Sequence, residues 1–380
     1  MRPRLFTPGP TQIPERVIAE MSQPLQHHRS PEFKQIFAEV SENLKQFFRT
    51  AGEVLTLTTS GSGAMESAVV NLLSKGDKVI SIEGGKFGER WGEICRAYGL
   101  QVVDIQVPWG DSIPAEEVRT TVRQHSDATA VFMTHSETST GVAFDVKGIS
   151  EVVHAESDAL LIVDGITSIG VLPFEKDQWH IDVAVSGSQK GVMIPPGLAF
   201  IALNDRAWDR AQNSDLPKYY LSLLKARKAL AQQSTPFTPA TTLLIGLRLS
   251  LEMILADGLP SFWEKYARLA HATREGAKAV GLELFASTPS NALTAIKVPD
   301  ELDGHKFVQT LREKYRVTVA GGQSQLKGKI FRVAHMGYYD HLDMVSFASA
   351  MEMALQDLGW RFELGKGVAA VQIAYATAGK

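Results

Sequence analysis

Apolar residues recur at helical spacing over residues 32–49, and short apolar runs then alternate with helical segments along the chain. These runs predict strands at 54–59, 78–82, 101–107, 128–134, 159–164, 182–186 and 198–203. Strands that alternate with helices in this way form a mostly parallel, doubly wound α/β sheet. Ligands of such sheets bind beyond the carboxyl ends of the strands, so functional side chains are expected there.

From residue 241 the helical segments become longer and the strands fewer. Helices are expected at 241–256, 260–280, 303–315 and 341–358, with strands at 292–298 and 330–334. This pattern predicts a second, smaller α+β domain. We therefore expect an N-terminal arm over 1–14, a large domain over 15–257, a small domain over 258–360, and a tail over 361–380 to which the sequence assigns no role.

Composition narrows the class of protein. The 39 basic and 42 acidic residues give a net charge of −3, which favours neither nucleic acid nor a membrane surface as a partner. No stretch reaches the roughly 18 consecutive apolar residues of a membrane-spanning helix. Cys95 is the single cysteine, so an internal disulfide and a cysteine-rich metal centre are excluded and a cytoplasmic location is expected. His27 and His28 are adjacent, but no carboxylate lies near them at the spacing of a metal site. We therefore predict no metal site there.

Small residues fill the turn after the expected strand 54–59, in the run Thr-Thr-Ser-Gly-Ser-Gly-Ala from Thr58 to Ala64. Backbone N–H groups in such a turn can approach a phosphate at a helix N-terminus. The run is not a Walker loop, because no Gly-Lys-Ser/Thr follows, and Glu66 breaks the match to a dinucleotide fingerprint. A tight turn without a ligand stays an equal alternative.

Two charged side chains follow expected strands. Asp164 ends the apolar run from Ala159, and Lys190 follows Ser-Gly-Ser-Gln after the strand 182–186. A lysine in a snug site loses its charge easily and can act as a Schiff-base nucleophile. The alternatives are a helix N-cap or a turn residue for Asp164 and a solvated surface lysine for Lys190. Together, however, a phosphate loop, a strand-end aspartate and a strand-end lysine are the groups that bind pyridoxal 5'-phosphate (PLP).

The same residues belong to a wider set of motifs. The sequence resembles the class V (fold type I) PLP-dependent aminotransferases of the serine–glyoxylate and alanine–glyoxylate group, and the resemblance covers the chain to about residue 359. It rests on Phe6–Pro10, His28-Arg29, Ser60–Gly63, Thr134–Gly141, Val163-Asp164, Ser186–Lys190, Pro196-Gly197 and Arg332. Four stretches are also similar to cyanobacterial proteins once named for a soluble hydrogenase small subunit: 85–91, 216–220, 235–239 and 329–333.

The resemblance implies a role for each matching position. Lys190 would form the imine with PLP and shuttle protons, and Asp164 would pair with the pyridine nitrogen. The other implied cofactor-binding residues are Ser62, Gly63, Ala64, Phe87, Thr138 and Gln189, with Thr238 reaching in from the second subunit of a homodimer. Arg332 would bind the substrate carboxylate, and the backbone at Gly9 would close over it. Plain core packing for Phe87 and a structural ion pair for Arg332 are the alternatives.

Two positions depart from the pattern of some relatives. Ala64 lies where they carry a histidine, and Thr235 lies where they carry a tyrosine that points toward the phosphate. Each change removes a side-chain contact that those relatives make with the cofactor. The affinity for the cofactor is therefore the property that these two changes would lower.

The function that this resemblance implies is transfer of an amino group from serine or alanine to glyoxylate or pyruvate. No Lys or Arg lies in Phe6–Pro10 or Ile194–Gly197, so small uncharged donors are expected and dicarboxylates disfavoured. One alternative is a non-catalytic partner of a hydrogenase complex, since one cysteine cannot build a hydrogenase centre. Another is a lyase or desulfurase on the same fold, which for a desulfurase would require a mobile cysteine late in the chain.

Overall fold

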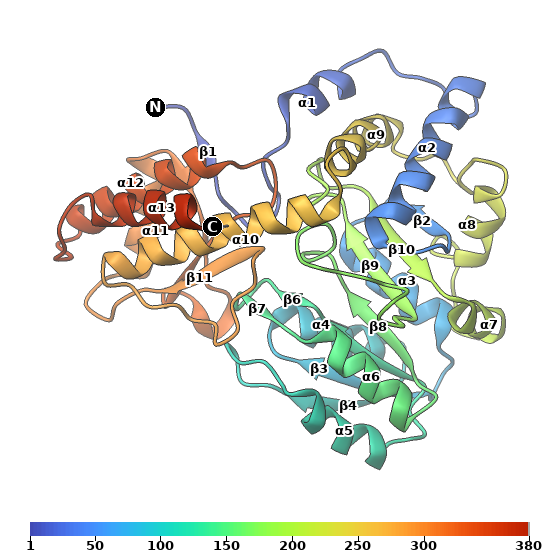
Figure 1. Cartoon of the computed structure of the whole chain (residues 1–380). Helices are drawn as coiled ribbons and strands as arrows, with labels where there is room; N and C mark the ends of the chain where they lie inside the picture. The colour runs from blue at the N-terminus through green and yellow to red at the C-terminus, as the bar shows by residue number, and fades with distance from the viewer. Residues whose placement is uncertain (379–380) are drawn as a thin grey trace.

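The computed structural model describes residues 1–378, and its centre is a seven-stranded sheet. The strand order is β2 (Val54–Leu57), β10 (Ala199–Leu203), β9 (Val183–Gly187), β8 (Leu160–Asp164), β5 (Ala130–Thr134), β3 (Lys78–Glu83) and β4 (Gln101–Gln106). Only β10 runs antiparallel to its neighbours, so the prediction of a mostly parallel, doubly wound sheet is confirmed. Figure 1 shows this sheet with helices around it.

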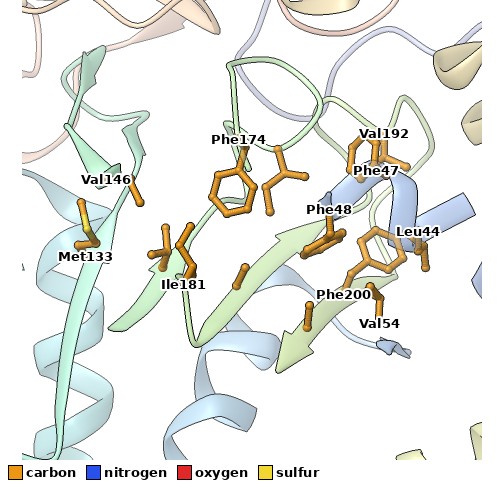
Figure 2. Packing of buried hydrophobic residues seen from close by; sticks show 14 of the residues in the cluster. Leu44, Phe47, Phe48, Val54, Met133, Val146, Phe174, Ile181, Val192 and Phe200 are labelled. Atoms are coloured by element: carbon orange, nitrogen blue, oxygen red, sulfur yellow. The ribbon is translucent and has the colours of Figure 1, made fainter. Parts of the chain in front are cut away.

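Strand β8 explains why helices cover both faces of the sheet. Its side chains are all buried, and they alternate between two apolar clusters: Leu161 and Val163 enter one, Leu160 and Ile162 the other. The first cluster contains residues of α2 (Pro31–Phe48), α5 (Ala115–Gln124), α6 (Val146–Glu156) and α9 (Thr241–Leu255), and Figure 2 shows Phe47, Phe48, Val54 and Phe200 gathered there. The second contains residues of α3 (Gly61–Leu72), α4 (Lys86–Ala97), α7 (Asp205–Asn213) and α8 (Leu223–Leu230).

The C-terminal elements bury a separate apolar cluster and lie to one side of the sheet in Figure 1. They comprise a small sheet of β11 (Leu293–Lys297), β14 (Ile330–Ala334) and β13 (Ala320–Gly321), with α10 (Leu259–Ala279), α11 (Gly304–Glu313), a 3-10 turn (Ser324–Leu326), α12 (His341–Asp357) and α13 (Lys366–Thr377). This arrangement agrees with the expected α+β composition, while the domain boundaries stay a prediction.

The N-terminal arm connects the two parts of the molecule. β1 (Arg4–Leu5) pairs in parallel with β12 (Val317–Thr318), and Phe6 is fully buried in the C-terminal cluster, where it stacks on Tyr339 at 5.4 Å. A few residues later, Thr11 Oγ1 donates a hydrogen bond of 3.0 Å to the carbonyl oxygen of Lys190. The arm is therefore anchored at both ends, which places Pro8 and Gly9 over Lys190.

Several elements were not predicted from the sequence: α1 (Glu15–Met21), α7, α8, α13 and the short hairpin of β6 (Ser136–Glu137) and β7 (Val142–Ala143). The helix α13 lies in the tail that had no recognisable period. The buried carboxylate of Glu352 accepts hydrogen bonds from the N–H groups of Gly367 and Val368, which fixes the start of α13 against α12. Over residues 1–378, no helix is long and apolar enough to cross a membrane.

Candidate active site

Asp164 and Lys190 meet at one edge of the sheet. β8 ends at Asp164 and its parallel neighbour β9 ends at Gly187, shortly before Lys190. Parallel strands end at the same edge, so the two side chains come together there. Both are buried, with 3% of Asp164 and 8% of Lys190 exposed. The solvated-lysine alternative is therefore wrong.

The amine of Lys190 is enclosed by the N-terminal arm. Nζ donates a short hydrogen bond to the carbonyl oxygen of Pro8. A Cβ atom on Gly9 would lie 2.5 Å from Nζ, and the φ of +141° at Gly9 also favours glycine. Burial lowers the pKa of Lys190 to about 8, although the negative charge of Asp164 opposes that change. A lysine with this pKa has a sizeable neutral, nucleophilic fraction near neutral pH.

Asp164 presents one oxygen to the site. Its Oδ1 accepts a hydrogen bond of 2.8 Å from the N–H of Ile166, and within residues 1–378 no hydrogen bond reaches Oδ2. Burial raises the pKa of Asp164 to about 7, while the Ile166 N–H and the charge of Lys190 act in the opposite direction. A cation that approached Oδ2 would favour the ionised carboxylate strongly.

The turn that contains Ser62 and Gly63 has the form of a phosphate cradle. In the described chain the N–H groups of Gly61 and Ser62, at the start of α3, donate to no acceptor. A Cβ on Gly63 would collide with the side chain of Thr59, so a larger residue would close the turn. Gln189 lies against the turn and its Oε1 is buried without a hydrogen-bond partner. The free N–H donors of the turn fit an anion such as the PLP phosphate, and Gln189 would donate to it through Nε2, since the unsatisfied Oε1 is an acceptor. Ala64 is fully buried in the apolar cluster on that face, so its methyl group packs in the core.

Arg332 and Thr138 are in contact with each other beside Lys190. Arg332 Nη1 donates to the carbonyl oxygen of Thr138 at 2.8 Å, and its other nitrogens donate to that of Gly321. Within residues 1–378 Arg332 forms no ion pair, so the structural ion pair is wrong. Burial lowers the pKa of Arg332 to about 10, which reflects a guanidinium without a counter-ion. Such a group is suited to a carboxylate ligand.

Two residues of the site make contacts that sequence reasoning did not assign to them. The buried carboxylate of Glu137 accepts hydrogen bonds from the N–H groups of Phe87 (3.1 Å) and Gly88 (2.9 Å) and therefore fixes the half-buried Phe87 at the start of α4. Arg90, one helical turn after Phe87, donates to Ser62 Oγ at 3.0 Å. Glu137 is adjacent to Thr138 in sequence, but its bonds to α4 depend on the fold. For Arg90, the spacing of three residues from Phe87 was the only available signal.

Thr238 is exposed and is not brought into the site by its own chain. The segment around it nevertheless contacts the end of β2: the N–H of Ala240 donates to Thr58 Oγ1, and Tyr220, which stacks on Phe237 at 5.0 Å, donates to the carbonyl oxygen of Thr58. Thr235 turns its hydroxyl back to the carbonyl oxygen of Phe237 at 2.6 Å. Thr238 therefore lies on the outer surface close to the phosphate turn.

No metal site accompanies these residues. Over residues 1–378, no group of three or more His, Cys, Asp or Glu side chains is arranged to hold a metal ion. Burial lowers the pKa of His135 to about 4, so its ring is neutral near pH 7.

Comparison with known proteins agrees with this geometry. The family model "Aminotransferase class-V" matches residues 4–354. The "Soluble hydrogenase, small subunit" of Synechococcus sp. is 42% identical, and the match covers 98% of both chains. The "L-aspartate--glyoxylate aminotransferase" of Paracoccus denitrificans is 37% identical over 98% of this chain and 96% of the relative. The "Serine--glyoxylate aminotransferase" of Hyphomicrobium methylovorum is 38% identical over 97% of this chain and 93% of the relative.

Among solved structures, the ureidoglycine–glyoxylate aminotransferase of Bacillus subtilis superposes with a TM-score of 0.95 at 29% identity, and the match covers 99% of each chain. Cysteine desulfurases also superpose, for example one from Thermococcus onnurineus with a TM-score of 0.75, but at 15% identity this shows the fold alone. The family match spans most of the chain and the aminotransferase relatives cover nearly all of it. The chain therefore belongs to the class V aminotransferases and is a transaminase.

Proposed function

We propose that this transaminase uses PLP to move the amino group of serine or alanine to glyoxylate or pyruvate. The observation that carries the proposal is the buried pair of Lys190 and Asp164 beside a turn with free N–H donors. When bound, PLP supplies an electron sink that stabilises negative charge at the carbon that loses its proton. The class V family itself implies an amino acid and a 2-oxo acid as substrates.

Each side chain of the site has a separate role in this proposal. The amine of Lys190 would hold the cofactor through its aldehyde and would take up the proton that the substrate carbon loses. Asp164 Oδ2 would stabilise a positive charge on the ring nitrogen, and the turn at Ser62 and Gly63, with Gln189, would bind the phosphate. Phe87 would support one face of the cofactor ring, and the hydroxyl of Thr138, which is 2.7 Å from that of Thr167, would hold the phenolic oxygen.

Arg332 binds the carboxylate of the substrate. Its two terminal nitrogens already point to carbonyl oxygens of Thr138 and Gly321, and a carboxylate can replace those weaker partners with a bidentate contact. Pro8 and Gly9 close over the same space from the arm, and there Gly9 leaves room for the lysine amine.

Donor choice tests this assignment. We expect kcat/KM with glyoxylate to be more than tenfold higher for serine and alanine than for aspartate and glutamate. A dicarboxylate needs a second unpaired cation, and Phe6–Pro10 and Ile194–Gly197 supply none. The measurement is steady-state kinetics of the four donors against glyoxylate and pyruvate. The relatives named above include both a serine and an aspartate enzyme, so aspartate within tenfold of alanine would reveal a second cation and overturn the donor assignment.

We further propose a homodimer whose sites are shared. Thr238 lies on a surface with several exposed large apolar side chains: Tyr219 is 71% exposed, Tyr220 49% and Leu224 40%. Apolar groups that gather on one surface favour a protein interface. Because this segment borders the phosphate turn of its own chain, a two-fold axis nearby would bring each Thr238 to the phosphate of the other subunit.

Mixed dimers test the sharing of sites. Thr238→Ala should weaken PLP binding about tenfold, through loss of one hydrogen bond to a charged group. In a dimer of one Lys190→Ala subunit and one Thr238→Ala subunit, one site takes Lys190 from the Thr238→Ala subunit and Thr238 from the Lys190→Ala subunit. That site is intact and should have wild-type affinity and activity. Thr235→Ala is the matched control and should have little effect, since its hydroxyl bonds within its own segment. Absence of any recovery in the mixed dimers, or a fully active monomer at micromolar concentration, would contradict the proposal.

The alternative functions have little support in the site. Cys95 is fully buried in α4, and burial raises the pKa of its thiol, so it is unsuited to the nucleophilic role of a desulfurase. A hydrogenase partner rests on the names of relatives alone. The visible absorbance and the metal content of the purified protein distinguish a transaminase from a component of a hydrogenase. Absorbance of bound PLP would support the transaminase, and stoichiometric metal would argue against it. A cytoplasmic location stays part of the proposal.

A further inference from the structure

Arg90 is a cation beside the phosphate turn with no anionic partner. It lies on α4, one turn after Phe87, and its guanidinium carbon is 4.9 Å from the centre of the Phe87 ring. Nη1 donates to Ser62 Oγ at 3.0 Å. Within the part of the chain that the structure describes, Arg90 forms no ion pair, whereas Arg96 on the same helix pairs with Asp104. A half-buried guanidinium that bonds only to a hydroxyl is a site for an anion.

The position of Arg90 beside Ser62 favours the cofactor phosphate as this anion. The bond from Nη1 occupies a lone pair of Ser62 Oγ, so the hydroxyl proton is free to donate to a group in the turn. The other two cations of the site are committed elsewhere, Lys190 beside Asp164 and Arg332 beside Thr138. The side chain of Ala64 is apolar and that of Thr235 is satisfied by its own segment, so neither adds a charge to the turn.

We propose that Arg90 neutralises the phosphate of PLP within its own subunit and orients the Ser62 hydroxyl toward it. The proposal rests on the proposed function, because it assumes PLP as the cofactor. It explains how the turn can hold a phosphate strongly without the histidine and tyrosine that some relatives carry at 64 and 235. It also assigns Phe87 a second contact, since the face of its ring that is turned to Arg90 supports the guanidinium.

Comparison of two ligands isolates the phosphate. The cofactor-free enzyme is titrated with PLP and with pyridoxal, which has the same ring and aldehyde and no phosphate, and binding is followed by absorbance. Arg90→Gln should weaken PLP about 30-fold and pyridoxal less than threefold, because only the phosphate loses its counter-charge. Arg90→Lys keeps the charge and should recover part of the PLP affinity. Arg96→Gln is the matched control on the same helix and should change neither affinity.

A double-mutant cycle tests the connection through Ser62. In a Ser62→Ala background, Arg90→Gln should cost several-fold less PLP affinity than in the wild type, because the two residues act on one group. Equal losses for PLP and pyridoxal would show that Arg90 acts through Phe87 or the fold and would overturn the proposal. Unchanged PLP affinity with a selective loss of activity toward aspartate would instead make Arg90 a substrate cation. Failure of the wild-type protein to bind PLP at all would refute the proposed function itself.

Discussion

Replacing Lys190 with alanine is expected to abolish transamination, with kcat reduced at least about 1,000-fold. The amine is the group in the site that can both attach to an aldehyde and move a proton at the substrate carbon, and a positioned general base alone contributes roughly 10²–10⁴-fold to a rate. Asp164 and Arg332 cannot replace it, since both are positioned to hold charges. The measurement is single-turnover and steady-state kinetics with serine and glyoxylate.

The fold should survive this change. Burial lowers the pKa of Lys190 from 10.5 to about 8, so keeping the amine protonated in the cofactor-free protein costs folding free energy at all pH values below 8. That cost is full below pH 8, falls between pH 8 and 10.5, and is absent above pH 10.5; removal of the amine therefore relieves it at pH 7. Lys190→Met, which keeps most of the side-chain volume, should therefore be at least as stable as the wild type at pH 7 in thermal unfolding without cofactor.

Two further measurements test whether Lys190 acts through its amine rather than through its charge or its volume. Lys190→Arg keeps a positive charge but cannot attach to an aldehyde, and it should be as inactive as Lys190→Ala. Small primary amines in the buffer should restore part of the activity of Lys190→Ala, because they can take up the proton that the lysine moved. Turnover of Lys190→Ala at near the wild-type rate would remove Lys190 from the mechanism.

The sequence predicted the sheet and its catalytic edge because β8 and β9 carry local signals. Runs of buried apolar residues followed directly by Asp164, or by small residues and Lys190, identify both strands and the edge at which they end. The contact between Arg90 and Ser62 has no comparable signal, because it joins two helices that pack on different strands, α4 on β3 and β5 and α3 on β9 and β10. The same holds for Glu137, whose partners Phe87 and Gly88 lie on another element.

The helix α13 escaped prediction for a different reason. Its small and apolar residues surround the whole helix, so the sequence shows no single apolar face. Packing against α10 and α12 orders it, together with the carboxylate of Glu352 at its start. Thr238 illustrates the remaining limit: its place on the surface follows from the fold of one chain, but its role in a site requires a second chain.

Replacing Asp164 with asparagine is expected to lower kcat at least about 100-fold when PLP is saturating. The neutral amide keeps the shape of the carboxyl group but cannot hold a positive charge on the ring nitrogen, so the electron sink is weakened when charge develops. Cofactor affinity should fall much less than kcat, because the phosphate turn and Lys190 still bind. Activity within threefold of the wild type would exclude Asp164 from the mechanism.

Asp164→Asn should also stabilise the cofactor-free protein, because the raised pKa of Asp164 lowers the stability of the wild type. Burial raises the pKa of Asp164 from 3.8 to about 7, so the folded state holds a proton that the unfolded state releases. The resulting cost in folding free energy is absent below pH 3.8, grows as the pH rises, and is complete above pH 7. Asp164→Asn removes the cost and should raise the free energy of unfolding by up to roughly 4 kcal/mol at pH 8, with a smaller gain at pH 5.5.

Asp182 provides the matched control at the opposite end of β9. It is also fully buried, but Leu161 N–H, Asn204 and Arg206 all donate to its carboxylate. Asp182→Asn should therefore destabilise the protein by about 1–3 kcal/mol, because the amide NH2 that replaces one carboxylate oxygen cannot accept the buried hydrogen bond donated to that oxygen, and kcat of the folded fraction should be unchanged. The two buried aspartates thus differ in the sign of the stability change and in the effect on kcat. Destabilisation by Asp164→Asn at pH 8 would show that the carboxylate is satisfied within the chain and is not held ready for a cation of the cofactor.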